Sequence, residues 1–329
     1  LSNAPGLNAF FNKFCTQEDL KDSILPSLEK AILRSPDLAL SLSKHLFNAL
    51  PSTFDLPKYF VESKLMSQII SSYKSSKENV RDLALENFGI AVSYESTEKT
   101  LTTVVDELLK ALKSLSATDQ KALVAKSLTL IPSNYEAVSN KIVSSLLNYV
   151  AKDQNEVSLN ELLSAYFKHF LSSFQNGWAT SNDAKSAALK GFKDPKLQLR
   201  KLWFTTLGST LQSFGLSEQL THFLSENFAA FVSSSEEVFN NPTNNFKGIT
   251  IPYVVSFIAG LIKGAEGRDD FFAKALADDN KPSVLTNPRV YSKFTTTYEK
   301  SWFVKALFAA TKNVQVSSVD FGKAWTVFI

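Results

Sequence analysis

The fold of this chain is decided by residues 79–88, NVRDLALENF, because the pattern of this stretch returns along the sequence. Counted from Val80, apolar residues follow at offsets of 3, 4, 8, 11 and 12. They are Leu83, Ala84, Phe88, Ala91 and Val92. Such offsets form one stripe on a helix of 3.6 residues per turn. The stretch therefore predicts an amphipathic helix with one apolar face.

The same pattern fits four other stretches, which begin at Leu38, Gln120, Leu159 and Leu199. The first copy is looser and continues through Leu42, Leu46, Ala49 and Leu50. With Val80 included, the five anchors are separated by 42, 40, 39 and 40 residues. A period of about 40 residues with two helices per unit is typical of HEAT and armadillo repeats. The sequence thus predicts an all-α fold, an α-α superhelix (solenoid) of the HEAT/armadillo type.

Composition narrows the class of protein. The 44% hydrophobic fraction is enough for a core and argues against disorder. The 35 basic and 32 acidic residues leave a net charge of +3, which is too small to indicate nucleic-acid binding by itself. A single cysteine, Cys15, cannot form an internal disulfide or a cysteine-based zinc site, which fits a reducing cytosol or nucleus. No apolar run approaches the roughly 20 residues of a membrane span, so we expect no membrane partner.

The repeat pattern predicts three parts. Residues 1–16 form a short N-terminal helix, residues 17–233 form regular HEAT-like repeats, and residues 234–329 continue the same solenoid less regularly. In the last part we expect a loop at 240–245 and helices at 251–262, 271–276, 301–312 and 316–329. The chain begins without methionine and ends in an apolar stripe, so we expect a fragment of a longer array.

Proline, glycine and capping residues predict helix ends. Pro26 should kink or restart the helix over residues 19–33. Ser35 and Pro36 form a start signal, a hydroxyl N-cap followed by proline at the first helical position. Pro51 should end that helix. Gly177 should interrupt the repeat pattern, and Gly215 should end the helix over residues 194–214.

We find no pattern of catalytic or ligand-binding residues. His45, His169 and His222 are far apart, with no second metal ligand one helical turn away. Cys15 has no neighbour that would mark it as a nucleophile. Neither of the common glycine-rich phosphate-binding motifs occurs. The sequence therefore predicts a protein that is not an enzyme, with no cofactor, no metal and no small-molecule substrate.

One stretch is unevenly charged. It contains Lys185, Lys190, Lys193, Lys196 and Lys201, and we call these five lysines the basic corner. Arg200 adds to them, against only Asp183 and Asp194. In a solenoid this set can meet a phosphate backbone or an acidic partner, or it is simply a solvated edge. Arg81 and Arg200 recur directly after their anchors, so we expect both to bond neighbouring corners of the fold.

Several stretches together resemble one family. They are residues 25–36 (LPSLEKAILRSP), Leu38, Leu40 and Leu42, residues 55–56, and residues 75–84 (SSKENVRDLA). They resemble the N-terminal part of the large HEAT-repeat translational activator of the general amino-acid control pathway. The likeness runs from about Phe14 to Phe88. Beyond it only the general sequence pattern of HEAT repeats continues, as at residues 194–200.

The resemblance implies a non-catalytic, cytoplasmic scaffold segment. Members of the family bind ribosomes, work with an ATP-binding-cassette partner, and stimulate the kinase that senses uncharged tRNA and phosphorylates initiation factor 2 alpha during amino-acid starvation. The kinase-docking region lies further along than this chain reaches. Two alternatives stay open: a karyopherin-type nuclear transport receptor or other HEAT-repeat scaffold, and a solenoid that binds RNA directly through the basic corner.

Overall fold

The computed structural model describes residues 5–50, 53–54, 63–94, 97–191 and 194–211, together with residues 214 and 297. Within these residues every regular element is helical and no strand occurs, so the all-α prediction is confirmed. The chain divides into two compact units, residues 1–145 and 146–329. The predicted loop at 240–245, the helix end at Gly215 and the four helices between residues 251 and 329 lie outside the described residues, so the three-part division stays a prediction.

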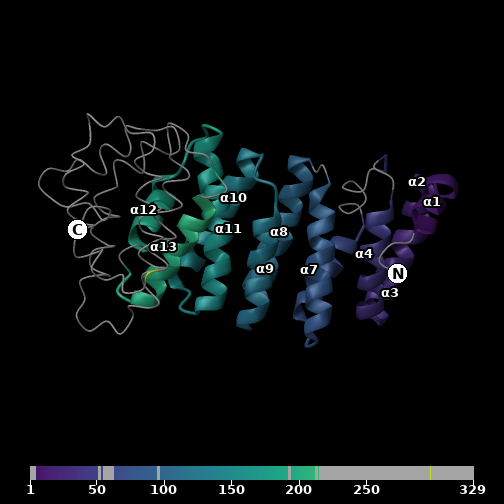
Figure 1. The fold of residues 1–329 in the computed structure, drawn as a ribbon, viewed down its shortest axis with the longest axis horizontal. Helices are drawn as coiled ribbons and strands as arrows, with labels where there is room; N and C mark the ends of the chain where they lie inside the picture. Colours follow the sequence, from purple (N-terminus) through teal and green to yellow (C-terminus); the bar gives the residue numbers. More distant parts are fainter. Residues whose placement is uncertain are drawn as a thin grey trace, which may run out of the picture. The chain divides into compact units, whose positions relative to one another are not determined.

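The helices follow one another in pairs along the chain (Figure 1). The first helices of the pairs are α3 (Leu25–Arg34), α6 (Leu65–Ser71), α8 (Glu98–Ser114), α10 (Glu136–Lys152) and α12 (Asn182–Gly191). The second helices are α4 (Pro36–Ala49), α7 (Glu78–Ser93), α9 (Thr118–Leu130), α11 (Glu156–Gln175) and α13 (Leu197–Leu211). Two short helices, α1 (Pro5–Phe14) and α2 (Gln17–Asp19), precede them. All five sequence anchors lie in the first turns of second helices.

The packing in the first unit makes two layers. The second helices form one layer, in which α4 packs on α7 and α7 on α9. The first helices form the other, in which α3 packs on α6 and α6 on α8. Each helix therefore has its counterpart from the next repeat as a neighbour, which is the arrangement of a solenoid. In the second unit, α13 packs on both α11 and α12.

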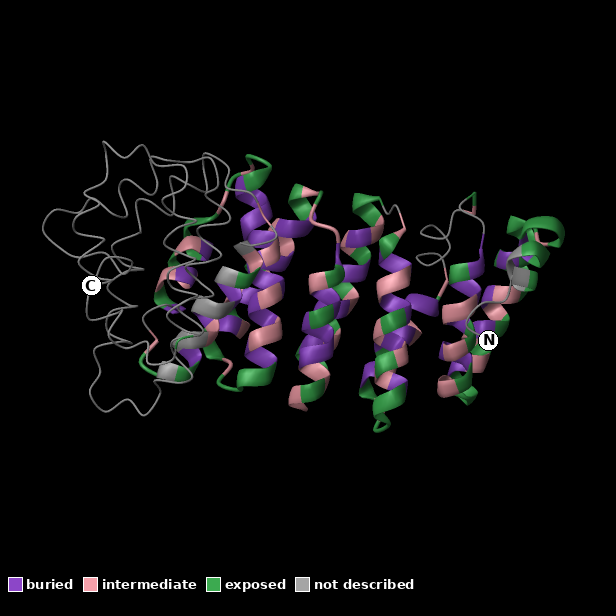
Figure 2. Cartoon of the chain, in the orientation of Figure 1, coloured by how far each residue is buried: buried purple, intermediate pink, exposed green. Residues whose placement is uncertain are grey.

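One buried frame recurs in all five second helices. It starts (position 0) at Ala39, Val80, Gln120, Leu159 and Leu199, and it continues at positions 4, 7, 8 and 11. These residues are buried, apart from Gln120 and Thr210, which are half-buried (Figure 2). Position 8 is always large and apolar: Phe47, Phe88, Leu128, Phe167 and Leu207. Burying each such side chain contributes about 1.5–3 kcal/mol.

The first copy of the sequence pattern was placed one residue too early. Leu38 and Leu42, which we expected on the apolar face, are exposed. The buried frame of α4 starts at Ala39 instead. A shift of one residue turns a helical face by about 100°, so the face chosen from leucines alone missed the smaller buried side chains of Ala39 and Ser43.

The helix starts near the N-terminus differ in part from the predicted ones. Pro26 lies in the first turn of α3, and a π-helical segment, η1 (Leu20–Ile24), leads into it. The chain thus stays helical past the proline, because the wider turn absorbs the change in hydrogen bonding. Pro36 occupies the first turn of α4 as predicted, but the Ser35 hydroxyl makes no capping bond, so that part of the prediction was wrong. Its backbone links two helices directly: the amide donates to Ala31 of α3 and the carbonyl accepts from Ala39 of α4.

Gly177 ends α11, in agreement with the predicted interruption. Its φ of 73° is in the left-handed region, which glycine adopts without steric cost. The Gly177 amide donates to the Phe174 carbonyl and the Trp178 amide donates to the Ser173 carbonyl. This is a Schellman motif, and it satisfies two carbonyls at the end of the helix.

Candidate functional site

The basic corner is the first candidate surface, and the structure describes only part of it. Lys185 is half-buried and Lys190 exposed on α12, and Lys196 is exposed just before α13. Lys193 lies outside the described residues. Lys201 lies in α13, but its side chain is not among those described. The structure therefore places three of the five predicted lysines at the α12–α13 connection.

Two of these three lysines are engaged within the protein. The Lys185 ammonium lies 5.9 Å from the centroid of the Phe174 ring, within the range of a cation–π contact. The Lys196 ammonium donates to the side-chain oxygen of Gln154, and its backbone amide donates to Asp194 at 2.8 Å. Such contacts hold the two lysine side chains against the rest of the protein.

Charged side chains of the second-helix layer join successive repeats. Lys44 on α4 pairs with Glu86 on α7 at 2.8 Å, and Arg81 on α7 pairs with Asp119 on α9 at 3.1 Å. The Arg81 guanidinium also donates to the carbonyl of Ser75 at 2.9 Å, in the corner that precedes α7. The predicted structural role of Arg81 is therefore confirmed. The side chain of Arg200 is outside the described part, so its role stays a prediction.

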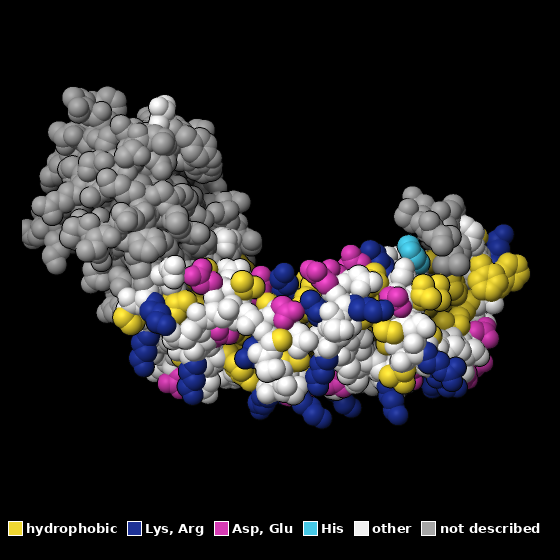
Figure 3. Space-filling model, turned by 90° about the horizontal axis from the view of Figure 1, so that it is seen from below, with side chains coloured by type: hydrophobic (Ala, Val, Ile, Leu, Met, Phe, Trp, Pro, Cys, Tyr) yellow, Lys and Arg dark blue, Asp and Glu magenta, His cyan; other side chains and the backbone are white. Residues whose placement is uncertain are grey.

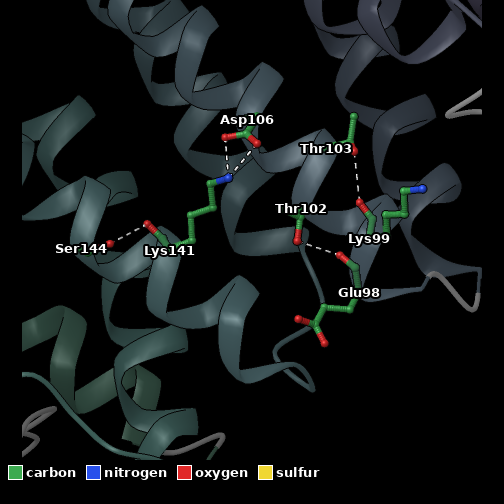
Figure 4. Close-up of polar contacts among 7 residues, drawn as sticks. All are labelled: Glu98, Lys99, Thr102, Thr103, Asp106, Lys141 and Ser144. Carbon is green, nitrogen blue, oxygen red and sulfur yellow. Dashed lines mark hydrogen bonds and ion pairs between the residues drawn. The ribbon is translucent and has the colours of Figure 1, made fainter.

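The first-helix layer has a comparable junction between α8 and α10 (Figure 4). Lys141 reaches from α10 to both carboxylate oxygens of Asp106, at 2.6 and 2.7 Å. Along α8, the hydroxyls of Thr102 and Thr103 donate to the carbonyls one turn earlier, which belong to Glu98 and Lys99. Glu98 and Lys99 themselves are exposed. This junction thus offers free charges of both signs beside a fixed ion pair.

Sequence reasoning missed most of these contacts between repeats. Lys44 and Glu86, Ser67 and Glu107, and Asp106 and Lys141 are 42, 40 and 35 residues apart, close to one period. A search for opposite charges one period apart would have found two of these three pairs. It would not have found Asn87, which is fully buried and whose amide donates to the Leu40 carbonyl of the preceding second helix at 2.8 Å.

Several ionisable side chains are shifted by burial. Burial raises the pKa of Tyr73 and of Tyr166 well above the usual range of a phenol. Burial lowers the pKa of Lys168 and raises that of Cys15, whose thiol also lies near the charge of Asp19. In the part of the chain that the structure describes, no group of three or more His, Cys, Asp or Glu could hold a metal ion. His169 is buried, His45 is half-buried, and His222 is outside that part.

Among the described helices, none combines the length and the apolar character that a membrane crossing needs. The candidate site is a set of surfaces along the described helices. Its chemistry is that of charged and polar side chains held in register by bonds between neighbouring repeats.

Comparison with known proteins agrees with this picture. The family described as General control nonderepressible 1 (Gcn1) N-terminal matches residues 117–329, and the family described as Stalled ribosome sensor GCN1 N-terminal matches residues 3–120. The eIF-2-alpha kinase activator GCN1 of Saccharomyces cerevisiae is 32% identical over 321 residues, which are 95% of this chain. The chain spans 11% of the length of that relative. Since the first of these families covers well over half of the sequence, the chain belongs to the Gcn1 N-terminal family.

Proposed function

We propose that this chain is a non-catalytic HEAT-repeat scaffold segment of a ribosome-associated translational activator. Membership of the Gcn1 N-terminal family carries the proposal. The yeast relative is named as an activator of the eIF-2-alpha kinase, and one matching family is described as a stalled ribosome sensor. In the proposal, the whole activator promotes phosphorylation of initiation factor 2 alpha in the cytoplasm during amino-acid starvation. This chain contributes one part of its contact surface.

We propose that this segment works by presenting exposed side chains to large partners in a fixed arrangement. Helix layers hold exposed side chains at a spacing set by the repeat, so a large partner meets many weak contacts in a defined order. The pairs Lys44–Glu86, Arg81–Asp119 and Asp106–Lys141 support this mechanism, because each one ties a repeat to the next. The ribosome is the partner proposed for this segment. The ATP-binding-cassette partner and the kinase would be engaged by the activator as a whole.

Cosedimentation with ribosomes across a salt series tests the proposal. We expect the 329-residue chain to pellet with ribosomes at low salt and to be released progressively as salt rises, because contacts to ribosomal RNA release counterions. A helical, folded chain that stays in the supernatant at every salt concentration would contradict ribosome binding by this segment.

Charge reversal separates the basic corner from the rest of the surface. The variant with Lys190→Glu, Lys193→Glu and Lys196→Glu should pellet less and show a shallower salt dependence if the corner contacts RNA. The control reverses Lys110 and Lys113 on α8, which are also exposed. Equal behaviour of both variants would leave the corner as a solvated edge.

The two alternatives predict different results. Direct RNA binding predicts that the chain binds an isolated RNA of about 20 nucleotides as tightly as it binds ribosomes, with a slope that the corner variant flattens. A nuclear transport receptor predicts neither interaction. The comparisons favour the translational activator over both.

A further inference from the structure

A basic residue lies at the end of every described first helix. It belongs to the last turn of α3, α8, α10 and α12, and to η2 (Ser72–Lys74), the 3₁₀ turn that continues α6. All five residues are exposed, and they follow one another at intervals of 38 to 40 positions: Arg34, Lys74, Lys113, Lys152 and Lys190. The basic residue therefore recurs once per repeat, at the same end of the first helices.

The helix dipole does not account for this distribution. A positive charge is favourable near the C-terminus of any α-helix, so the effect should act on first and second helices alike. The last turns of the five described second helices, α4, α7, α9, α11 and α13, contain no basic residue. Basic residues are thus placed where a first helix ends and its second helix begins.

In the first unit, the last two turns of the three first helices carry an excess of exposed positive charge. They contain five exposed basic residues, whose charged ends bond no other described residue. We call these five the basic ridge: Lys30, Arg34, Lys74, Lys110 and Lys113. The two acids in the same turns are half-buried and bonded to the neighbouring helix region. Glu29 accepts from the Lys64 amide at 2.8 Å, and Glu107 accepts from the Ser67 hydroxyl at 2.7 Å.

The other ends of the same three helices are balanced in charge. Lys21 stands beside Asp22 shortly before α3, and Lys99 stands beside Glu98 in the first turn of α8. All four side chains are exposed. Figure 3 looks onto the ends at which the first helices finish and shows lysine and arginine side chains spread along them. The excess of positive charge is therefore a property of these ends and not of the whole helices.

The spacing of the basic ridge suits a regular polyanion. In the first unit α3 packs on α6 and α6 on α8. Packed helices lie about 8–10 Å apart, so the ridge extends over about 20 Å. A nucleic-acid duplex carries a negative charge about every 1.7 Å, and several phosphates fit along that length. Phosphates also accept bonds from hydroxyl groups, and the exposed Ser27 and Ser71 lie three residues before Lys30 and Lys74.

We propose that the basic ridge binds the phosphate backbone of ribosomal RNA. The inference rests on the proposed ribosome binding and names the surface that makes the contact. The ridge is better suited to this contact than the basic corner, because Lys185 and Lys196 of the corner are held by Phe174 and Gln154. Contacts to the backbone position the chain on RNA and do not read its sequence.

Two triple variants of the full 329-residue chain test this assignment. The ridge variant carries Arg34→Gln, Lys74→Gln and Lys113→Gln. The matched control carries Lys21→Gln, Lys64→Gln and Lys99→Gln, near the opposite ends of the same helices. Each variant loses three positive charges, so the two have the same net charge. All six side chains are exposed, so circular dichroism should stay unchanged.

The measurements are cosedimentation with ribosomes across a salt series and filter binding to deproteinised ribosomal RNA. The ridge variant should leave ribosomes at lower salt, with a slope of log affinity against log salt that is shallower by about three. Its affinity for the RNA should fall by about tenfold or more. The matched control should keep both affinities within about twofold. The reversal of Lys110 and Lys113 should lower pelleting more than reversal of the basic corner.

The results that would overturn the proposal differ from one another. If the unmodified chain pellets and the two triple variants behave alike, or if reversal of the basic corner costs more than reversal of Lys110 and Lys113, ribosome binding stands and the ridge is not its contact. If the ridge variant pellets less but binds deproteinised RNA normally, the ridge meets an acidic ribosomal protein instead. An unmodified chain that does not pellet would remove the proposed ribosome binding and the ridge contact with it.

Discussion

The second helices of the two units use one frame with different chemistry. Position 4 holds Ser43, Ala84 and Val124 in the first unit and Leu163 and Trp203 in the second. Position 7 holds Leu46, Asn87 and Ser127 in the first unit, and Tyr166 and Thr206 in the second. The two units thus differ most clearly at position 4, where the first carries small or medium-sized residues and the second carries large ones.

Small residues in the first unit allow direct bonds between helices. The Asn87 amide reaches the backbone carbonyl of Leu40 at 2.8 Å, which requires close approach of α4 and α7. The Ser127 hydroxyl bonds the buried Tyr73 hydroxyl at 2.6 Å. Each bond satisfies groups that would otherwise be buried without a partner, so the contact is directional and specific.

Aromatic rings connect the helices of the second unit. Trp203 of α13 meets the Phe167 ring edge-to-face, with centroids 5.7 Å apart, and the Tyr166 ring at 6.1 Å. Tyr166 also stacks on Phe170 at 5.5 Å, and its hydroxyl donates to the Ala184 carbonyl of α12. In this unit, burial of the aromatic ring surfaces contributes most of the stabilisation. The second unit also has a bond between second helices, from the Thr206 hydroxyl to the Asn160 side-chain oxygen at 3.3 Å, so both units use bonds and the second adds buried ring area.

The largest expected effect comes from removing the central ring. Trp203→Ala should lower the free energy of unfolding by about 3–5 kcal/mol, because it leaves a cavity between α11 and α13. Hydrogen exchange by mass spectrometry should show faster exchange in residues 156–175 and an unchanged rate in residues 78–93. Trp203→Phe, which keeps one ring, should cost less. A loss below about 1 kcal/mol for the alanine variant would contradict the role of the ring cluster.

A smaller loss should follow from removing the amide between α4 and α7. Asn87→Ala deletes bonds to the carbonyls of Leu40 and Leu83 and should cost about 2–3 kcal/mol in chemical denaturation. Asn79→Ala, at an exposed position of the same helix, is the matched control and should change stability little. Similar losses in the two variants would show that the buried bond is unimportant.

Replacing Tyr73 should lower the free energy of unfolding by about 1 kcal/mol and should also change how stability depends on high pH. Tyr73→Phe removes the bond to Ser127. Burial raises the pKa of Tyr73, so above the ordinary phenol pKa of about 10 the unfolded chain releases a proton that the folded chain retains. Stability should therefore fall as pH rises above 10, and it should fall less in Tyr73→Phe. Ser127→Ala removes the bond but keeps the phenol, so its pH dependence should persist; identical pH profiles for all three proteins would refute this assignment.

The smallest effect belongs to the ion pair between Lys44 and Glu86. Both side chains are partly exposed, so Lys44→Met should cost no more than about 1 kcal/mol. The difference from the unmodified chain should shrink in about 1 M salt, where charges are screened. Glu86→Gln should behave alike, and the double variant should lose no more than either single one. Additive losses would mean that the two residues do not act as a pair.

The candidate surfaces were only partly foreseeable. The role of Arg81 followed from its position directly after the anchor, since that position faces the next corner in a helical repeat. The engagement of Lys185 by the Phe174 ring could not follow from the sequence, because the two residues are on different helices, 11 positions apart, and meet only after the turn at Gly177. The exposure of Leu38 and Leu42 was hidden for a related reason: both have the spacing of core residues, and only packing showed that they are exposed.

By itself the sequence determined the all-α fold, the period of about 40 residues and the helices in which the anchors lie. These features follow from local periodicity, and residues within a few turns of each other are enough to produce it. The tertiary structure alone decided which residue starts the buried frame of α4, which charged and polar groups bond between repeats, and which leucines remain exposed. Those outcomes depend on residues a whole repeat apart, such as Asn87 and Leu40, whose contact exists only when two helices are packed side by side.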